Sequence, residues 1–317
     1  MLNSLRSQLS KVQPFWFIIL ALSLILGGIY LHHLITHQTP DRVAITIPVV
    51  NLAVYWYGVL IVSGIMLGAY AVSFEVQRRG MDPDHVWGGL VYAVILAVIG
   101  ARIYHILTPP PSLCQSIGIC TPLDYLRDPL RLFDFRGGGL GIFGAIIGAI
   151  VGLIIYGWRH KIDWLAYADL GSYGLALGQW LGRWGNFFNQ ELYGKPTDLP
   201  WAVYIDRPLA PHTDRRLFHP AFLYESLWNL LVFFILYLLA TRCRERLLRG
   251  ELLGLYLILY PIGRILLETV RLDSATLIIA GQDTGVNIAT AVSVLLAVGV
   301  AIVLAVRRLR RTAARQS

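Results

Sequence analysis

The chain has 317 residues, of which 56% are hydrophobic and 15% charged, and its mean hydropathy is +0.59. Soluble domains carry about 25% charged residues, so the composition excludes a soluble globular fold and indicates a polytopic membrane protein. The net charge of +8 would suggest a nucleic-acid partner in a soluble chain. Here the basic residues follow apolar segments, which argues against nucleic acid.

Eight apolar segments each approach the length of about 20 residues that crosses the hydrocarbon layer as a helix. In lipid the backbone must satisfy its own hydrogen bonds, and the segments lack the period-2 alternation of barrel strands. The sequence therefore predicts an all-α membrane helix bundle. Its expected spans are 14–34, 51–76, 86–107, 138–158, 167–183, 222–240, 251–270 and 286–306.

Basic residues concentrate after alternate spans, at 77–79, 159–161, 241–249 and 307–315. Alternate spans end on one side of the membrane, and the positive-inside rule assigns that side and the C-terminus to the cytoplasm. Arg6 and Lys11 precede the first span and place the N-terminus on the same side. No clear small-residue cleavage site follows before His32, so segment 14–34 is interpreted as an uncleaved signal-anchor. The expected external connections are 35–50, 108–137 and 184–221.

The expected external connections contain two cysteines that could form a disulfide and a proline-rich segment that could form a surface arm. Cys114 and Cys120 lie in one of them, where an oxidising compartment permits a disulfide, although two free thiols are the open alternative. Cys243 lies in a cytoplasmic basic loop and is expected to be a free thiol. The segment 195–221 contains five prolines and an apolar stretch at 201–205, which predicts a small surface arm with a short strand.

Glycines line one face of the span at 138–158. They stand at positions 141, 144, 148 and 152, a spacing that lets a neighbouring helix approach closely. We therefore interpret them as packing residues. The preceding glycine-rich stretch, 136–141, would let backbone amides approach a ligand, but a flexible loop is the simpler interpretation.

Polar and ionisable residues gather at the outer ends of several spans. Charged side chains inside spans are costly and usually face a bundle interior or a cavity, so each is a candidate for a functional site. The inner halves of the same spans contain almost no ionisable groups. The residues concerned are Tyr57, Arg102, His105, Arg183, Asn186, His219, Tyr224, Glu225, Tyr260, Arg264, Glu268 and Arg271.

The arginines in this group have a functional and a structural interpretation. Tyr260, Arg264 and Glu268 share a helical face at i, i+4 and i+8. Guanidinium groups match phosphate oxygens, and the phosphate most available at this depth is a phospholipid head group. The structural alternative pairs Glu268 with Arg264 or Arg271, pairs Glu191 with Arg183 or Arg102, and explains Arg271 by snorkelling towards the interface.

Among functions, an enzyme that uses membrane lipid is favoured. The chain lacks the patterns of zinc, serine-hydrolase and nucleotide sites. An ion-coupled carrier would place its charges near the bilayer midplane, whereas these charges lie off-centre. A lipid transporter or scaffold that only binds the head group is the alternative from another class.

The stretch G-R-W-G-N-F-F-N-Q-E-L-Y-G at 182–194 closely resembles the signature of the prolipoprotein diacylglyceryl transferase family. Supporting matches are Y-W-Y-G at 55–58, G-A-R-I-Y at 100–104, H-P-A-F-L-Y-E at 219–225 and Y-P-I-G-R-I-L-L-E-T-V-R at 260–271. The resemblance runs from about 50 to 306. It implies a seven-helix transferase core at 51–306 with an external arm at about 187–221. Residues 1–50 then add a cytoplasmic tail, an extra span and an external linker, and 307–317 form a basic cytoplasmic tail.

The resemblance also implies the reaction and its partners. In a bacterial cell membrane, the diacylglyceryl group of phosphatidylglycerol would pass to the lipobox cysteine of a prolipoprotein, giving a thioether and glycerol phosphate. The active site would face the outer leaflet, and no metal or cofactor is expected. Expected catalytic residues are Arg183, Arg264, Tyr57, Asn186, Glu191 and Tyr260. Expected substrate-binding residues are Arg183, Arg102, Asn189, Gly194, His219 and Glu268.

One position departs from the family pattern. Many members carry a histidine at the start of the glycine-rich helix, where this chain has Phe143. Phenylalanine cannot accept a proton, so the general base must be another group or the family's histidine is not the base. The candidates are Glu191, Glu268, His105 and His219.

Overall fold

The computed structural model describes residues 13–49, 52–109, 114, 119–133, 139–208, 210–272, 276–279 and 282–316. The expected tail at 1–12 and residues 136–138 of the glycine-rich stretch lie outside the described residues. The α-helices are α2 (Pro14–Thr36), α3 (Trp56–Arg78), α4 (Asp84–Leu107), α6 (Ile142–His160), α7 (Trp164–Gly182), α8 (Trp184–Asn189), α9 (Ala221–Arg242), α10 (Glu251–Glu268) and α11 (Ile288–Gln316).

Six of the described helices, α2, α3, α4, α6, α9 and α11, are long and apolar enough to cross a membrane. The polytopic membrane helix bundle is therefore confirmed. Helices α7 and α10 also occupy predicted spans, with 19 and 18 residues, and are less apolar. Helix α11 continues through the basic residues at its end, so the described part of the expected C-terminal tail is helical.

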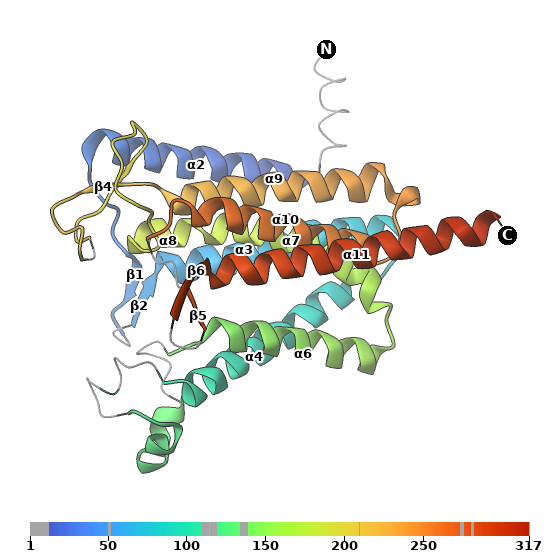
Figure 1. Ribbon diagram of the computed structural model, residues 1–317, viewed down its shortest axis with the longest axis horizontal. Helices are drawn as coiled ribbons and strands as arrows, with labels where there is room; N and C mark the ends of the chain where they lie inside the picture. The colour runs from blue at the N-terminus through green and yellow to red at the C-terminus, as the bar shows by residue number, and fades with distance from the viewer. Residues whose placement is uncertain are drawn as a thin grey trace. The chain divides into compact units, whose positions relative to one another are not determined.

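Among the described residues, three two-stranded antiparallel sheets interrupt the all-helical expectation. Strand β1 (Val43–Ile47) pairs with β2 (Leu52–Tyr55), so α3 begins at Trp56 rather than near 51. Strand β5 (Thr276–Ile279) pairs with β6 (Gln282–Asn287) just before α11. The predicted arm contains β3 (Val203–Tyr204) and β4 (Leu217–Phe218). Figure 1 shows α8, the β1–β2 hairpin and β4 at the same end of the helices α2, α3 and α9.

The contacts divide the chain into two compact units, one of Met1–Glu75 with Ala168–Ser317 and one of Val76–Tyr167. In the first unit, α3 and α7 meet through glycines, because a Cβ added at Gly64 would lie 2.6 Å from the carbonyl oxygen of Gly178. Helix α2 packs on α9 through aromatic rings, with Trp16 stacked on Phe234 at 5.6 Å. The backbone approach of small residues and the ring contacts fix these helices side by side.

In the second unit, α4 and α6 pack along the glycine face of α6. A Cβ added at Gly144 would overlap the carbonyl oxygen of Gly100, and one at Gly148 would overlap that of Leu96. The interpretation of these glycines as packing residues is confirmed.

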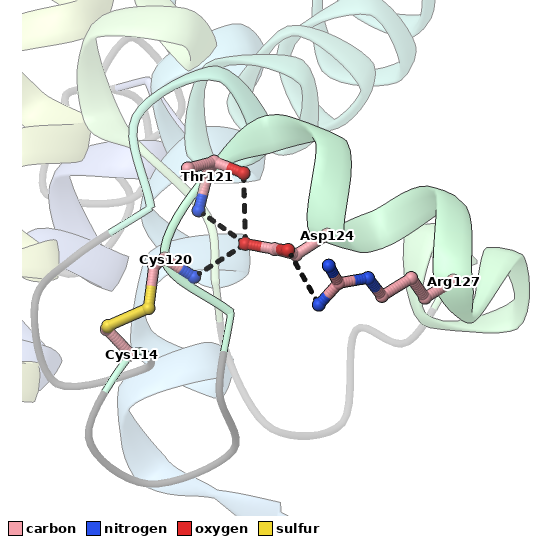
Figure 2. The surroundings of a disulfide bond; sticks show 5 residues. All are labelled: Cys114, Cys120, Thr121, Asp124 and Arg127. Carbon is pink, nitrogen blue, oxygen red and sulfur yellow. Dashed lines mark hydrogen bonds and ion pairs between the residues drawn. A yellow bond between two sulfur atoms is a disulfide. The ribbon is translucent and has the colours of Figure 1, made fainter.

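The second unit also contains the 3₁₀ helices η1 (Pro122–Arg127) and η2 (Pro129–Phe133) and the predicted disulfide. Cys114 and Cys120 are bonded, which decides between the two alternatives left by the sequence. Figure 2 shows Asp124 beside the bridge, where it accepts hydrogen bonds from the amides of Cys120 and Thr121 and from the Thr121 hydroxyl. The hydrogen bonds from Thr121 hold the pKa of Asp124 below its ordinary value. Cys243, next to η3 (Arg244–Arg246), is a free thiol as expected.

Candidate functional site

The centre of the polar cluster is Glu225, in the second turn of α9. Its carboxylate meets three guanidinium groups: Arg183 Nε lies 2.6 Å from Oε2, Arg271 Nη1 lies 3.5 Å from Oε1, and Arg264 Nη1 lies 3.9 Å from Oε1. The Glu225 side chain is only 8% exposed. A buried carboxylate needs compensating charge, and one carboxylate therefore holds three arginines together.

A second carboxylate completes the cluster. Arg264 Nη2 lies 3.1 Å from Glu268 Oε2, one helical turn further along α10, which confirms one of the predicted pairings. Asn287 donates a hydrogen bond of 2.7 Å to the other oxygen of Glu268. Three guanidinium groups and two carboxylates leave one net positive charge in this arginine cluster, which we define as Arg183, Glu225, Arg264, Glu268 and Arg271.

Arg271 does not extend to an interface as the snorkelling interpretation predicts. Its side chain is 13% exposed, and its Nε is buried without a hydrogen-bond acceptor among the described residues. The indole nitrogen of Trp184, beside Arg183 in the chain, is a buried donor in the same situation. Buried donors without acceptors are rare and costly. An anion oxygen at the cluster would satisfy such a donor.

Helix α8 presents the amides of the signature stretch to Glu191. Asn186 Nδ2 donates to Glu191 Oε1 at 2.9 Å, and Asn189 Nδ2 donates to the same oxygen at 3.3 Å. The left-handed backbone of Gln190, with φ of 53°, ends the helix and turns the chain back towards Asn186. Arg183 pairs with Glu225 rather than with Glu191, so the predicted Arg183–Glu191 pairing is wrong.

Gly194 lies where three backbone segments meet. Its N–H donates to the carbonyl of His219 at 2.8 Å, and it forms a β-bridge with Arg271. A Cβ at this position would lie 2.5 Å from the carbonyl oxygen of Val270 and 2.8 Å from the His219 Cβ. Only glycine fits this approach, which fixes the backbone of Arg271 beside the start of α9.

The two predicted tyrosines pack against these elements. Tyr57 lies against Gly185 of α8, because a Cβ added there would lie 2.6 Å from the tyrosine ring. Tyr260 stacks on Tyr256 at 5.9 Å, and the Tyr256 hydroxyl donates to Gln179 of α7 at 3.1 Å. Both tyrosines therefore belong to the same unit as the arginine cluster.

Arg102 belongs to the second compact unit, Val76–Tyr167. Its Nε donates to the carbonyl of Leu132 at 2.9 Å, its Nη1 donates to that of Gly139 at 3.2 Å, and its Nη2 donates to that of Arg131. These bonds give the buried guanidinium a structural task in the connection before α6. Its expected role in substrate binding stays a prediction.

An apolar pocket of about 250 Å³ lies between α9 and α10. Its lining includes Tyr224, which precedes Glu225, and Val270, which precedes Arg271. A larger groove of about 640 Å³ lies elsewhere, along α2. The pocket between α9 and α10 thus places apolar surface next to the cationic cluster, the combination that an amphipathic anion requires. No group of three His, Cys, Asp or Glu side chains suited to a metal occurs among the described residues.

The sequence interpretation included Glu225 and Arg271 among the candidate polar residues but gave neither of them a catalytic or substrate-binding role. One available signal was the spacing of Arg264, Glu268 and Arg271, which places all three on one face of a continuing helix. The central position of Glu225 had no comparable signal, because it depends on contacts among three segments distant in sequence.

The fold and the site together define a multi-pass membrane protein that gathers three arginines and two glutamates in one cluster. Residues 42–306 match the family model of the prolipoprotein diacylglyceryl transferases, and the chain belongs to this family.

Relatives that carry the name of this family are similar to the chain over most of its length. The phosphatidylglycerol–prolipoprotein diacylglyceryl transferase of Chloroflexus aggregans is 38% identical over 250 residues, which cover 74% of this chain and 78% of the relative. The enzyme of the same name from Thermotoga maritima is 37% identical, over 76% of this chain and 78% of the relative. That of Frankia alni is 40% identical, over 80% of this chain and 63% of the relative. Helix α2 lies outside the residues that match the family model.

Proposed function

We propose that this transferase moves the diacylglyceryl group of phosphatidylglycerol to the lipobox cysteine thiol of a prolipoprotein. The bond between the glyceryl carbon and the phosphate oxygen breaks, a carbon–sulfur bond forms, and glycerol phosphate leaves. The observation that carries this proposal is the arginine cluster, in which three guanidinium groups share two buried carboxylates. Family membership supplies the reaction class.

The net charge of the cluster suits the lipid. A phosphodiester carries one negative charge, which balances the one positive charge left by the five residues of the cluster. As the glyceryl bond breaks, charge grows on the leaving phosphate, and a phosphate monoester carries about −1.5 to −2 at neutral pH. Guanidinium groups that are already oriented by Glu225 and Glu268 stabilise this growing charge without reorganisation. Arg183, Arg264 and Arg271 are the proposed donors.

The attacking thiol must lose its proton, since a free cysteine has a pKa of about 8.5. Phe143 excludes a base at its own position, so we compare the remaining candidates in the unit of the arginine cluster. Glu268 is held by Arg264 and Asn287, and His219 lies 3.2 Å from the Tyr224 hydroxyl. Glu191 is exposed and accepts its hydrogen bonds from neutral amides. We propose Glu191 as the acceptor of the thiol proton.

We further propose seven family-type spans plus α2, with both termini in the cytoplasm and the arginine cluster at the outer leaflet. Helices α3, α6 and α9 end in basic residues, and α11 ends in a run of them, as the positive-inside rule requires. Glu225 lies at the start of α9, which is the opposite end from its basic residues. Helices α7 and α10 complete the spans, and α10 carries Tyr260, Arg264 and Glu268 of the site.

The test is transfer from labelled phosphatidylglycerol to a lipobox peptide by the purified protein. Arg183→Ala is expected to reduce kcat about 10²–10³-fold, the cost of one oriented donor. The variant should remain folded, because Glu225 keeps Arg271 and Arg264 as partners. Arg183→Lys should show a smaller loss, since it keeps the charge but not the fork of donors.

Arg244→Ala, an exposed arginine of η3, is the matched control and should be fully active. Full activity of Arg183→Ala would remove Arg183 from the site. Head-group-dependent lipid binding by the wild-type protein without any thioether product would instead identify a lipid transporter or scaffold.

A further inference from the structure

Helix α2 is not part of the segment that matches the family, yet its outer end carries two buried polar side chains. Tyr30 is 6% exposed and His33 is 1% exposed. Burying polar groups without partners is costly, so their partners show what the end of this helix does. Both side chains bind the backbone of the external arm, at Trp201 and Tyr204.

His33 is held by both ring nitrogens. The N–H of Tyr204 in β3 donates to His33 Nε2 at 3.0 Å, and His33 Nδ1 lies 2.8 Å from the carbonyl oxygen of Gln38. A carbonyl only accepts hydrogen bonds, so Nδ1 carries the proton and Nε2 is left as the acceptor. The partners therefore fix one neutral tautomer of a fully buried imidazole, which makes a directional contact between α2 and the arm.

Tyr30 forms a second contact one helical turn earlier. Its hydroxyl donates to the carbonyl of Trp201 at 2.8 Å. Its ring stands edge-on to Phe187 of α8 and Phe222 of α9, at 5.6 Å from each. The same side chain thus binds the arm through its hydroxyl and packs on two site-bearing helices through its ring.

The linker after α2 forms a third contact. Thr39 Oγ1 donates to Asp206 Oδ2 at 2.5 Å, and Gln190 Nε2 donates to the same oxygen at 2.7 Å. The N–H of Asp206 returns a bond of 2.9 Å to Gln190 Oε1. The hydrogen bonds from Thr39 and Gln190 hold the pKa of Asp206 below its ordinary value. Asp206 of the arm is therefore bound both to the linker, through Thr39, and to Gln190, which ends α8.

The arm in turn reaches the arginine cluster at two places. The Trp201 indole donates to the Tyr224 hydroxyl at 2.9 Å, and Tyr224 immediately precedes Glu225. At the base of the arm, the N–H of Lys195 donates to the carbonyl of Val270 at 2.7 Å, immediately before Arg271. Contacts therefore run without a break from α2 through the arm to both sides of the cluster.

We propose that α2 holds the arm in place beside the arginine cluster, and that Tyr30 and His33 are positioning residues for the transfer reaction. The helix outside the family match is thus part of the working site rather than only a membrane anchor. The kinetic part of this inference rests on the proposed transfer. Whether α2 holds the arm in place can be measured without the transfer reaction.

The first experiment measures how tightly the arm is fastened, by limited trypsin digestion of the full chain in proteoliposomes. The arm contains two exposed trypsin sites, Arg215 and Arg216, whereas Arg207 is followed by Pro208 and resists trypsin. When opening is fast, cleavage follows the population of the opened arm. His33→Leu removes both ring hydrogen bonds and should raise cleavage about tenfold, the effect of losing roughly one to two net hydrogen bonds.

His33→Gln keeps a side-chain oxygen that can accept from Tyr204, so it should restore most of the protection. His32→Leu, at the exposed neighbouring position, is the matched control and should digest like the wild type. Cleavage of His33→Leu at the wild-type rate would overturn the fastening. Equal cleavage of His33→Leu and His33→Gln would overturn the role of the accepted bond.

The second experiment measures transfer with Tyr30→Phe, which loses the bond to Trp201 and keeps the ring packing, so the fold is preserved. We expect kcat/KM to fall several-fold, with the thermal midpoint unchanged. Tyr70→Phe in α3, whose ring packs on Phe74, is the matched control. Faster digestion with unaltered kinetics would overturn the positioning role. If the wild type itself transfers nothing, the proposed function fails, and the trypsin result still decides whether α2 holds the arm.

Discussion

Replacing Glu225 by glutamine tests the arginine cluster most directly. The substitution keeps the size of the side chain and removes the charge that three guanidinium groups share. Arg264 retains Glu268 at 3.1 Å, whereas Arg183 and Arg271 lose the carboxylate that they contact at 2.6 and 3.5 Å. Their side chains are 26% and 13% exposed, so water replaces the lost partner only in part.

Removing one member of a buried ion pair costs about 3–5 kcal/mol. The partial exposure of Arg183 favours the lower end, so we expect Glu225→Gln to lose about 3 kcal/mol of unfolding free energy. At roughly 2 °C per kcal/mol for a large domain, the thermal midpoint should fall by about 6 °C. Glu245→Gln, an exposed glutamate in η3, is the matched control and should leave the midpoint unchanged.

The same substitution should strengthen anion binding. With Glu225 neutral, the cluster carries two net positive charges instead of one, which suits a phosphate monoester better. One added charge about 4 Å away is worth roughly 1–4 kcal/mol between the aqueous and partly buried limits. We therefore expect glycerol phosphate to bind at least about fivefold more tightly to Glu225→Gln, a difference of about 1 kcal/mol. The assay is the ligand-dependent shift of the thermal midpoint in detergent.

Glu225→Gln should therefore lower the thermal midpoint and raise the affinity for glycerol phosphate, a combination that distinguishes the proposal from general damage. A generally damaged fold would lower both the thermal midpoint and the affinity for glycerol phosphate. An unchanged midpoint would refute the conclusion that Glu225 holds the arginines together. A lower midpoint with unchanged or weaker affinity would refute the conclusion that the net charge of the cluster attracts phosphate.

Two further predictions concern parts of the chain away from this cluster. Gly148→Ala should destabilise the α4–α6 pair and lower the thermal midpoint, because the added Cβ overlaps the Leu96 carbonyl. The control is Gly299→Ala in α11, where the added Cβ meets no atom within 4 Å, so this substitution should be neutral or slightly stabilising. Thiol labelling of the unreduced, denatured protein should modify Cys243 alone, since the other two cysteines form a disulfide; three labelled thiols would contradict the bridge.

The helix bundle could be predicted from the sequence because lipid imposes a long apolar run on every span. The β1–β2 hairpin could not, since a short apolar strand beside a span has the same hydropathy as the first turn of that span. Residues 52–55 are apolar and continue directly into α3, so they looked like its first turn. Pairing with Val43–Ile47 removes them from the helix, and this depends on contact between two segments rather than on either segment alone.

The gathering of the polar residues was predictable, but most of their pairing was not. Position along a span predicted that Arg183 and Arg264 lie at the same end of the bundle, and both contact Glu225. It does not fix the direction of the side chain. Arg271 follows the end of α10, where snorkelling is the usual outcome, yet the bridge between its backbone and Gly194 holds it against Glu225. The tertiary contact overrides the local preference.

The incomplete neutralisation of the cluster is best explained as a functional compromise. A third carboxylate would pair the remaining guanidinium and stabilise the empty protein, but it would also occupy the position of the phosphate. Buried charges that lack full compensation are costly, and such costs gather at sites where a ligand supplies the missing partner. The buried Nε of Arg271, which has no acceptor among the described residues, is the same compromise at the level of one hydrogen bond. If the proposed lipid phosphate is the missing partner, the contacts of α2, the arm and Gly194 hold the arginine cluster together while that partner is absent.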